Sequence, residues 1–154
     1  MTANVKLGHV ALSAQNPGAL AAFYHALLGL EQTLEGTLPN LGDFVFLSDT
    51  TNERQQTLTF MTRAEARHVA WEVESLTALQ GIYAAAKAQD ALVLFALDHG
   101  VTVSLYLRDP EGNSFEVYWP TGRAAAGLQA APIDLALFEQ PQEVLLAQSN
   151  APAR

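Results

Sequence analysis

The sequence predicts an α+β fold built from two copies of one strand–helix–strands module. Three observations indicate this class. A group of residues recurs at an offset of 59 positions, strand-like alternation and helix-like periodicity follow one another twice, and 49% of the 154 residues are apolar, which is enough to form a core. We expect a single domain over residues 1–120, with modules at about 5–62 and 66–120, followed by a linker, a short helix and a tail over 121–154.

The repeat is visible in three separate stretches of the chain. The matched segments are His9-Val10-Ala11 with His68-Val69-Ala70, Ala19-Leu20 with Ala78-Leu79, and Tyr24 with Tyr83. Three stretches that agree on one offset rarely arise by chance. Each copy is therefore expected to form the same elements in the same order.

Local signals define the elements of the first copy. Residues Val5 to Ser13 alternate between two faces, which is typical of a half-buried strand, and His9 lies within it. A helix follows, because Asn16 can cap it, Pro17 suits its first position and Gly29 ends it. Its apolar stripe consists of Leu20, Phe23, Tyr24, Leu27 and Leu28. The next strand-like runs are Leu30 to Gly36, Phe44 to Ser48 and Thr57 to Met61.

The second copy shows the same order. Val69, Trp71 and Val73 alternate after His68, and an Ala-rich helix is expected from about Leu76 to Lys87. The strand-like runs that follow are Ala91 to Phe95, Val101 to Arg108 and Ser114 to Trp119, the last two joined by the turn Asp109-Pro110-Glu111-Gly112-Asn113. The remaining segments are an Ala/Gly/Pro-rich linker, Thr121 to Pro132, and an amphipathic stretch, Ile133 to Ala147.

Composition excludes several classes of function. The net charge of −8 disfavours nucleic acid and anionic membrane surfaces as partners. The chain has no cysteine, so any metal must be held by histidine and carboxylate side chains. The N-terminus lacks the pattern of a signal peptide, and no stretch has the length of a membrane helix. We therefore expect a soluble, cytoplasmic protein.

The histidines suggest a metal site, because His9 and His68 occupy the same place in the two copies. If the copies pack with approximate two-fold symmetry, both can face one cavity. Alternation in the last strand places Glu116 opposite its large apolar neighbours, where a carboxylate is costly to bury without a positive partner. Two histidines and one carboxylate form the facial ligand set that leaves positions open on Fe(II). The residue at the same offset in the first copy is Thr57, so three protein ligands are expected.

These residues resemble the vicinal-oxygen-chelate superfamily, which contains glyoxalases, fosfomycin-resistance thiol transferases, bleomycin-binding proteins and extradiol ring-cleaving dioxygenases. The resembling segments are Leu7 to Leu12, Phe23 to Leu30, His68 to Val73, and Tyr106 to Asn113 with Glu116. The resemblance covers about residues 5–120. It implies paired βαβββ modules that form a curved, open mixed sheet around a metal cavity, and it implies a homodimer.

One part of the chain favours a particular branch. The run Asp98 to Pro110 resembles catechol 2,3-dioxygenase-like proteins, in which a histidine and a tyrosine precede the metal-binding glutamate. This resemblance implies an extradiol-type dioxygenase that opens a small catecholic ring with O2, with Fe(II) at the three ligands. His99 would then act as acid and base, and Tyr106 would hydrogen-bond a substrate oxygen.

Two alternatives stay open. A glyoxalase-like lyase or a thiol transferase would use the same three ligands with Mn, Zn or Ni, although Thr57 disfavours a four-ligand glyoxalase and the few basic residues disfavour a phosphonate substrate. A non-enzymatic protein would instead bind a small molecule, such as an antibiotic, in an apolar cavity. Whatever the ligand, we expect Phe60, Trp71 and Tyr118 to line the pocket. The negative net charge favours a neutral aromatic diol as substrate.

Overall fold

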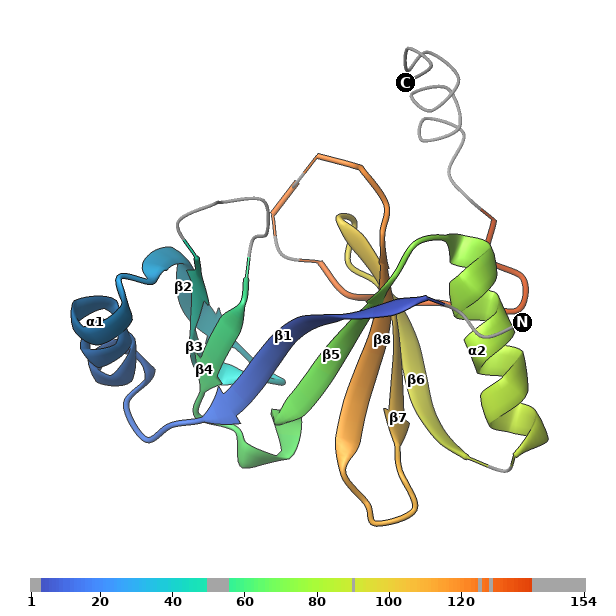
Figure 1. Cartoon of the computed structure of the whole chain (residues 1–154), viewed down its shortest axis with the longest axis horizontal. Coiled ribbons are helices and arrows are strands. Elements are labelled where there is room, and N and C mark those ends of the chain that lie inside the picture. The colour runs from blue at the N-terminus through green and yellow to red at the C-terminus, as the bar shows by residue number, and fades with distance from the viewer. Residues whose placement is uncertain (1–3, 50–55, 90, 125, 128, 140–154) are drawn as a thin grey trace. The chain divides into compact units, whose positions relative to one another are not determined.

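The fold repeats the order strand, helix and three strands (Figure 1). The structure is a computed structural model, and it describes residues 4–49, 56–89, 91–124, 126–127 and 129–139. The chain divides into two compact units, a first unit of Leu7–Ala70 and a second unit of Met1–Lys6 with Trp71–Arg154. The described part contains two α-helices, and its strands pair both in parallel and antiparallel. The expected α+β class with paired βαβββ modules and an open mixed sheet is confirmed.

The first unit holds the first βαβββ module. Its elements are β1 (Val5–Ser13), α1 (Pro17–Leu28), β2 (Glu31–Leu38), β3 (Gly42–Ser48) and β4 (Leu58–Met61), followed by a short 3-10 helix, Ala64–Ala66. β2, β3 and β4 are antiparallel neighbours, and β1 pairs with β4 in parallel. Because Leu12 is the register partner of Phe60, these two side chains project from the same face of the sheet.

Helix α1 has the expected ends. The Asn16 side chain accepts a hydrogen bond from the Ala19 amide at 2.9 Å, and Gly29 ends the helix with φ 73°. The expected apolar stripe is only partly buried, however. Ala21 is buried in the core beneath the helix, and Leu20 and Tyr24 pack on that core partly buried, whereas Phe23, Leu27 and Leu28 are exposed. The helix thus packs through only part of its apolar stripe.

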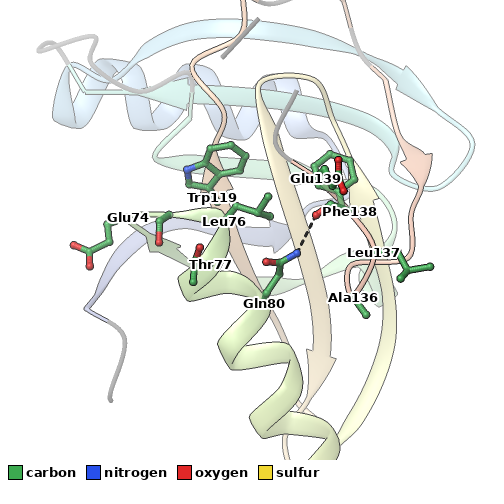
Figure 2. A pocket seen from close by; sticks show the side chains of 10 residues that line it. Glu74, Leu76, Thr77, Gln80, Trp119, Ala136, Leu137, Phe138 and Glu139 are labelled. Atoms are coloured by element: carbon green, nitrogen blue, oxygen red, sulfur yellow. Dashed lines mark hydrogen bonds between the residues drawn. The ribbon is translucent and has the colours of Figure 1, made fainter. Parts of the chain in front are cut away.

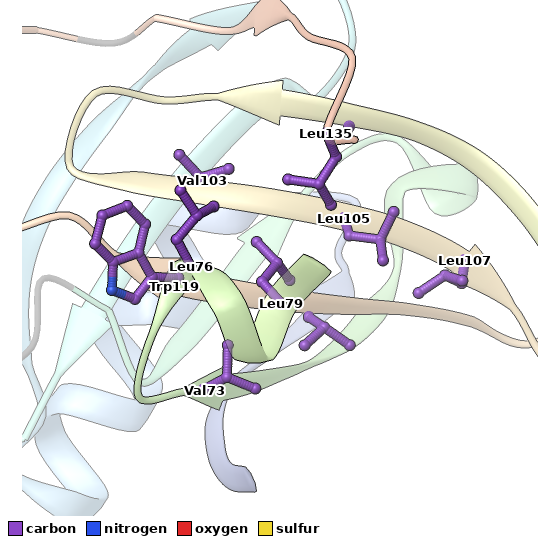
Figure 3. Packing of buried hydrophobic residues seen from close by; sticks show 10 residues of the cluster. Val73, Leu76, Leu79, Val103, Leu105, Leu107, Trp119 and Leu135 are labelled. Atoms are coloured by element: carbon purple, nitrogen blue, oxygen red, sulfur yellow. The ribbon is translucent and has the colours of Figure 1, made fainter. Parts of the chain in front are cut away.

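The second unit holds most of the second module. Its elements are β5 (His68–Val73), whose first three residues fall in the first unit, α2 (Leu76–Ala88), β6 (Leu92–Asp98), β7 (Thr102–Arg108), β8 (Ser114–Pro120) and β9 (Ala131–Pro132). The strand order β8-β7-β6-β9 is antiparallel throughout. Figure 3 shows the core between α2 and these strands, in which Leu79, Val103 and Leu105 are fully buried.

Alternation in β8 determines which side chains enter this core. Val117 and Trp119 pack toward α2, and Glu116 and Tyr118 project from the other face of the sheet. Leu135, beyond the last long strand, is 1% exposed and belongs to the same core. Of the amphipathic stretch 133–147, residues 133–139 form a turn that packs on the second unit, and the remainder lies outside the described residues.

The turn between β7 and β8 is held by one side chain. Asp109 Oδ1 accepts hydrogen bonds from the amides of Glu111 and Asn113, and its Oδ2 accepts one from the Asn113 side chain. These bonds, those from Asn113 above all, lower the pKa of the Asp109 carboxyl. Among the described residues, no helix is long and apolar enough to cross a membrane.

Candidate functional site

The two repeat-related histidines lie close together in the first unit. His9 on β1 is 5% exposed, and its Nε2 lies 3.1 Å from Nε2 of His68, with the rings edge to face. His68 Nδ1 lies 2.7 Å from the carbonyl oxygen of Ala66. Because a carbonyl oxygen only accepts, Nδ1 carries the proton, and in a neutral His68 ring the nitrogen that can accept is Nε2, which faces His9.

A glutamine completes this cluster. The Gln56 side-chain nitrogen lies 3.2 Å from Nδ1 and 3.3 Å from Nε2 of His9. The Thr59 hydroxyl, buried on β4, donates to Gln56 Oε1 at 3.1 Å and fixes the amide in place. The neighbouring Thr57, the repeat counterpart of Glu116, has its hydroxyl buried without a hydrogen-bond partner.

The buried carboxylate belongs to the second unit. Glu116 on β8 is 4% exposed and is the register partner of Tyr106 on β7. Burial, and then the negative charge of Glu116 and a hydrogen bond with it, raise the pKa of the Tyr106 hydroxyl well above its usual value. Ser104 is fully buried on the same face of β7, and its hydrogen bond to Tyr106 acts in the opposite direction by lowering this pKa. Tyr106 therefore stays a neutral phenol at physiological pH.

His99 extends this group at the end of β6. Its Nε2 lies 3.2 Å from the Tyr106 hydroxyl, and its Nδ1 lies 2.8 Å from the carbonyl oxygen of Gln129. The ring of Phe95, which is 49% exposed, packs at 4.8 Å on the ring of Tyr106. His99, Tyr106 and Glu116 thus form a continuous polar cluster on one face of the second unit.

The three expected pocket residues have different surroundings. The Tyr118 hydroxyl donates to Glu72 Oε2 at 3.2 Å, on the same face of β8 as Glu116. Phe60 lies in the core beneath α1, with its ring 5.1 Å from that of Tyr24. Trp71 is 36% exposed and, by alternation in β5, projects from the face opposite to that of Glu72. Of the two that belong to the second unit, Trp71 and Tyr118, only Tyr118 shares a face with the polar cluster.

One basic residue near this cluster is already paired. Arg123 forms an ion pair with Asp98, next to His99. Arg108, at the end of β7, is exposed. The cation of Arg123 is thereby neutralised by a carboxylate, which weakens it as a binding group for an anionic substrate.

A separate pocket of about 680 Å³ opens beside the start of α2 (Figure 2). It is lined by Glu74, Ser75, Leu76, Thr77, Gln80, Trp119, Ala136, Leu137, Phe138 and Glu139. Trp119 lies on the face of β8 that packs toward α2, opposite to Glu116. None of the site residues expected from the sequence lines this pocket.

Comparison with known proteins decides the family. Residues 6–117 match the Glyoxalase/Bleomycin resistance protein/Dioxygenase superfamily. The chain belongs to this superfamily. The assignment agrees with the resemblance found in the repeats and applies to both units.

One curated member is biphenyl-2,3-diol 1,2-dioxygenase 2 of Rhodococcus globerulus, 30% identical in an alignment of 125 residues that covers 76% of this chain and 64% of that protein. The fold is also similar to a crystal structure of catechol 2,3-dioxygenase, with TM-score 0.64 and 23% identity over 92% of this chain and 50% of that one. A Mn(II)-bound glyoxalase from Novosphingobium aromaticivorans gives TM-score 0.64 at 18% identity, over 84% of this chain and 44% of the other. The chain therefore spans between about two fifths and two thirds of the length of these superfamily members.

The donor set suits a divalent metal in a member of this superfamily. His9 and His68 of the first unit offer imidazole nitrogens, and Glu116 of the second unit offers a carboxylate oxygen, which are ligand types that divalent metals use. The Nε2 atoms of His9 and His68 lie 3.1 Å apart, a distance at which one ring donates a hydrogen bond to the other. The hydrogen bond from His68 to Ala66 is the kind of outer contact that orients a ligating histidine.

Sequence reasoning missed three residues of these clusters. Gln56 and Gln129 lie outside the regular strands, so no periodicity marks them. Ser104 could have been predicted from the sequence, because alternation along β7 places it on the same face as Tyr106. The repeat pointed to the histidines, but it gives no information on contacts made by only one copy.

Proposed function

We propose that this protein is an Fe(II)-dependent dioxygenase of the extradiol type, which opens the ring of a small catecholic substrate with O2. The observation that carries the proposal is the cluster in which Tyr106 contacts His99 at 3.2 Å and stands opposite Glu116. Support also comes from the 30% identity to a biphenyl-2,3-diol dioxygenase. A neutral His and a neutral phenol next to a ligating carboxylate provide a base and a hydrogen-bond donor for a diol.

For the metal we propose His9, His68 and Glu116 as ligands. The bond to Ala66 orients the His68 ring as a ligating histidine is oriented, and Glu116 would supply a buried carboxylate oxygen. When bound, Fe(II) with two histidines and one carboxylate supplies the open positions and the electron-transfer chemistry that reaction with O2 requires.

The residues of the second unit would carry out the proton transfers. His99, whose Nδ1 is occupied by the Gln129 carbonyl, has Nε2 available to take a proton from a catechol hydroxyl. Tyr106 would donate its hydroxyl hydrogen to the other substrate oxygen, and its raised pKa keeps that hydrogen in place. Tyr118, anchored by Glu72, would limit the pocket on the same face.

The substrate class follows from charge. The chain has a net charge of −8, and Arg123 is paired with Asp98. A phosphonate or other anion would find little positive potential near the cluster. A neutral aromatic diol meets no such penalty and can stack on the exposed ring of Phe95.

An anaerobic reconstitution tests the proposal. The protein is loaded with Fe(II) in the absence of O2 and then mixed with O2 and a panel of catechols, and the coloured ring-opened product is measured. We expect turnover by the wild type and by His25→Asn, which alters an exposed histidine of α1, and a loss of about 10²-fold or more in kcat for His99→Asn. Stoichiometric iron without any ring opening rules the reaction out.

A second candidate is a glyoxalase-like reaction at Mn, Zn or Ni. The observation that favours it is the His9–His68 pair, which would bind the metal of such a reaction without any catalytic role for His99. Metal analysis of protein purified without chelators separates the two, because bound iron favours the proposed oxygen chemistry. The homodimer that the resemblance implies stays a prediction, which sedimentation equilibrium tests.

A further inference from the structure

We propose that the segment after β8 is a positioning element that holds His99 in its Nδ1-protonated tautomer, so that Nε2 faces Tyr106. We call the described residues 121–124, 126–127 and 129–139 the C-terminal strap. The proposal rests on the proposed function only for the catalytic role of His99. The contacts themselves belong to the second unit alone.

The tautomer follows from hydrogen-bond chemistry. The Gln129 carbonyl oxygen lies 2.8 Å from His99 Nδ1 and can only accept, so Nδ1 must carry a hydrogen. In a neutral ring, Nε2 then carries the lone pair and lies 3.2 Å from the Tyr106 hydroxyl. The Glu116 carboxylate is the other acceptor for the single hydrogen of that hydroxyl. Free histidine prefers the opposite tautomer, with the hydrogen on Nε2. The strap therefore selects the form in which Nε2 can act as a base.

The strap is bound to the turn that carries His99. Thr121, 1% exposed, donates its hydroxyl hydrogen to the Gly100 carbonyl at 2.6 Å and accepts a bond from the Arg123 amide at 3.0 Å. Arg123 forms the ion pair with Asp98, whose Oδ1 also accepts from the Gly100 amide at 2.8 Å. Contacts from the strap thus reach the residues on both sides of His99.

Gly100 gives the turn after His99 its backbone conformation. Its φ is +81°, a value that glycine adopts without strain. A Cβ there would meet the Gln129 side chain only at its flexible end, which can move aside. The sequence His99-Gly100 therefore provides the functional ring and the turn to which the strap is bound.

The far end of the strap is anchored in the core. The Ile133 amide donates to the Ala96 carbonyl at 3.1 Å, and Leu135 is 1% exposed among the residues of Figure 3. Gln80 of α2 donates to the carbonyls of Leu135 and Phe138 at 3.0 and 2.9 Å, the second of which is marked in Figure 2. A segment fixed at both ends can hold the Gln129 carbonyl in one position.

Nitrogen-15 NMR of the histidine rings measures the tautomer directly. Full-length, chelator-treated protein labelled at histidine is recorded above the ordinary His pKa of about 6.5, and His99 is assigned by the signal missing from His99→Gln. We expect the Nδ1–H tautomer in the wild type. Arg123→Ala and Thr121→Val should shift His99 toward Nε2–H, and Arg123→Lys should restore part of the Nδ1–H form.

Controls separate orientation from loss of fold. Leu137→Ala alters a strap residue that is 78% exposed and should leave the His99 signals unchanged. The His25 ring, whose Nδ1 faces the Leu30 carbonyl at 2.8 Å, is an internal reference that strap variants should not move. Circular dichroism confirms that each variant is folded. If Thr121→Val does not fold, Arg123→Ala decides the test.

The outcomes distinguish this inference from the proposed reaction. An Nε2–H tautomer in the wild type, or unchanged His99 signals in both folded strap variants, overturns the role of the strap even if catechols are cleaved. A shifted tautomer without catechol turnover by the wild type leaves the strap in place and removes the proposed reaction. If both hold, kcat of Arg123→Ala should fall by about 10-fold with KM little changed.

Discussion

Tyr106 and Glu116 face each other as register partners on β7 and β8, and the buried carboxylate raises the pKa of the tyrosine hydroxyl after burial itself has done so. The pair joins a residue suited to hydrogen-bond a substrate with a residue suited to bind a metal. His99 contacts the hydroxyl at 3.2 Å. The second unit therefore places an imidazole, a phenol and a carboxylate next to one another in one polar cluster.

The first prediction concerns the ionisation of Tyr106. Its folded pKa lies above the ordinary value of about 10, so the folded protein keeps this proton at a pH where the unfolded chain loses it. The resulting contribution to stability is complete below that ordinary value and is lost as pH rises through the folded pKa. In an alkaline ultraviolet titration of folded protein, Tyr106→Phe should match the wild type up to about pH 10. Loss of tyrosinate absorbance in Tyr106→Phe in that range contradicts the prediction.

The second prediction concerns the turn between β7 and β8. Hydrogen bonds from Asn113 and from backbone amides lower the pKa of Asp109, so the stabilisation exists above the unfolded pKa and disappears as pH falls through the folded one. Asp109→Asn should lower the urea midpoint at neutral pH, and the difference from the wild type should shrink in acid. Glu111→Gln, in the same turn, is the matched control. An Asp109→Asn difference that is constant with pH would argue against this mechanism.

The third prediction contrasts two phenylalanines of the first unit. Phe60 is fully buried beneath α1, and Phe23 on α1 is 57% exposed. Phe60→Ala should lower the free energy of unfolding by about 3–5 kcal/mol because it leaves a cavity, whereas Phe23→Ala should change it by less than about 1 kcal/mol. Denaturant unfolding of both variants provides the comparison. Equal losses would mean that Phe23 is covered in solution.

Much of the fold could be predicted from the sequence, because its signals are local. The cap at Asn16, the glycine at Gly29 and the alternation around Glu116 each act within a few residues, and the structure shows the expected elements there. The 59-residue offset added the equivalence of His9 and His68, whose Nε2 atoms lie 3.1 Å apart. Local pattern and repeat together were enough for the class and the element order.

Other features could not be obtained this way. At the 59-residue offset Phe60 corresponds to Trp119, and each lies in the hydrophobic core of its own unit. The pocket role of Phe60 stays a prediction. The bond from His99 to Gln129 joins positions 30 apart through a backbone carbonyl, which no residue type encodes. In α1, hydrophobic spacing does not tell which members of the stripe contact the sheet.

Iron stoichiometry tests the proposed centre most directly. After anaerobic incubation with Fe(II) and removal of free metal, iron per chain is measured in the wild type, in Glu116→Gln and in Glu72→Gln, a matched carboxylate held by Tyr118. We expect about one iron per chain in the wild type and in Glu72→Gln, and a 10- to 100-fold weaker affinity or none in Glu116→Gln, as in His9→Asn and His68→Asn. Undiminished iron in Glu116→Gln, or no iron in the wild type, would contradict the assignment of His9, His68 and Glu116 as ligands.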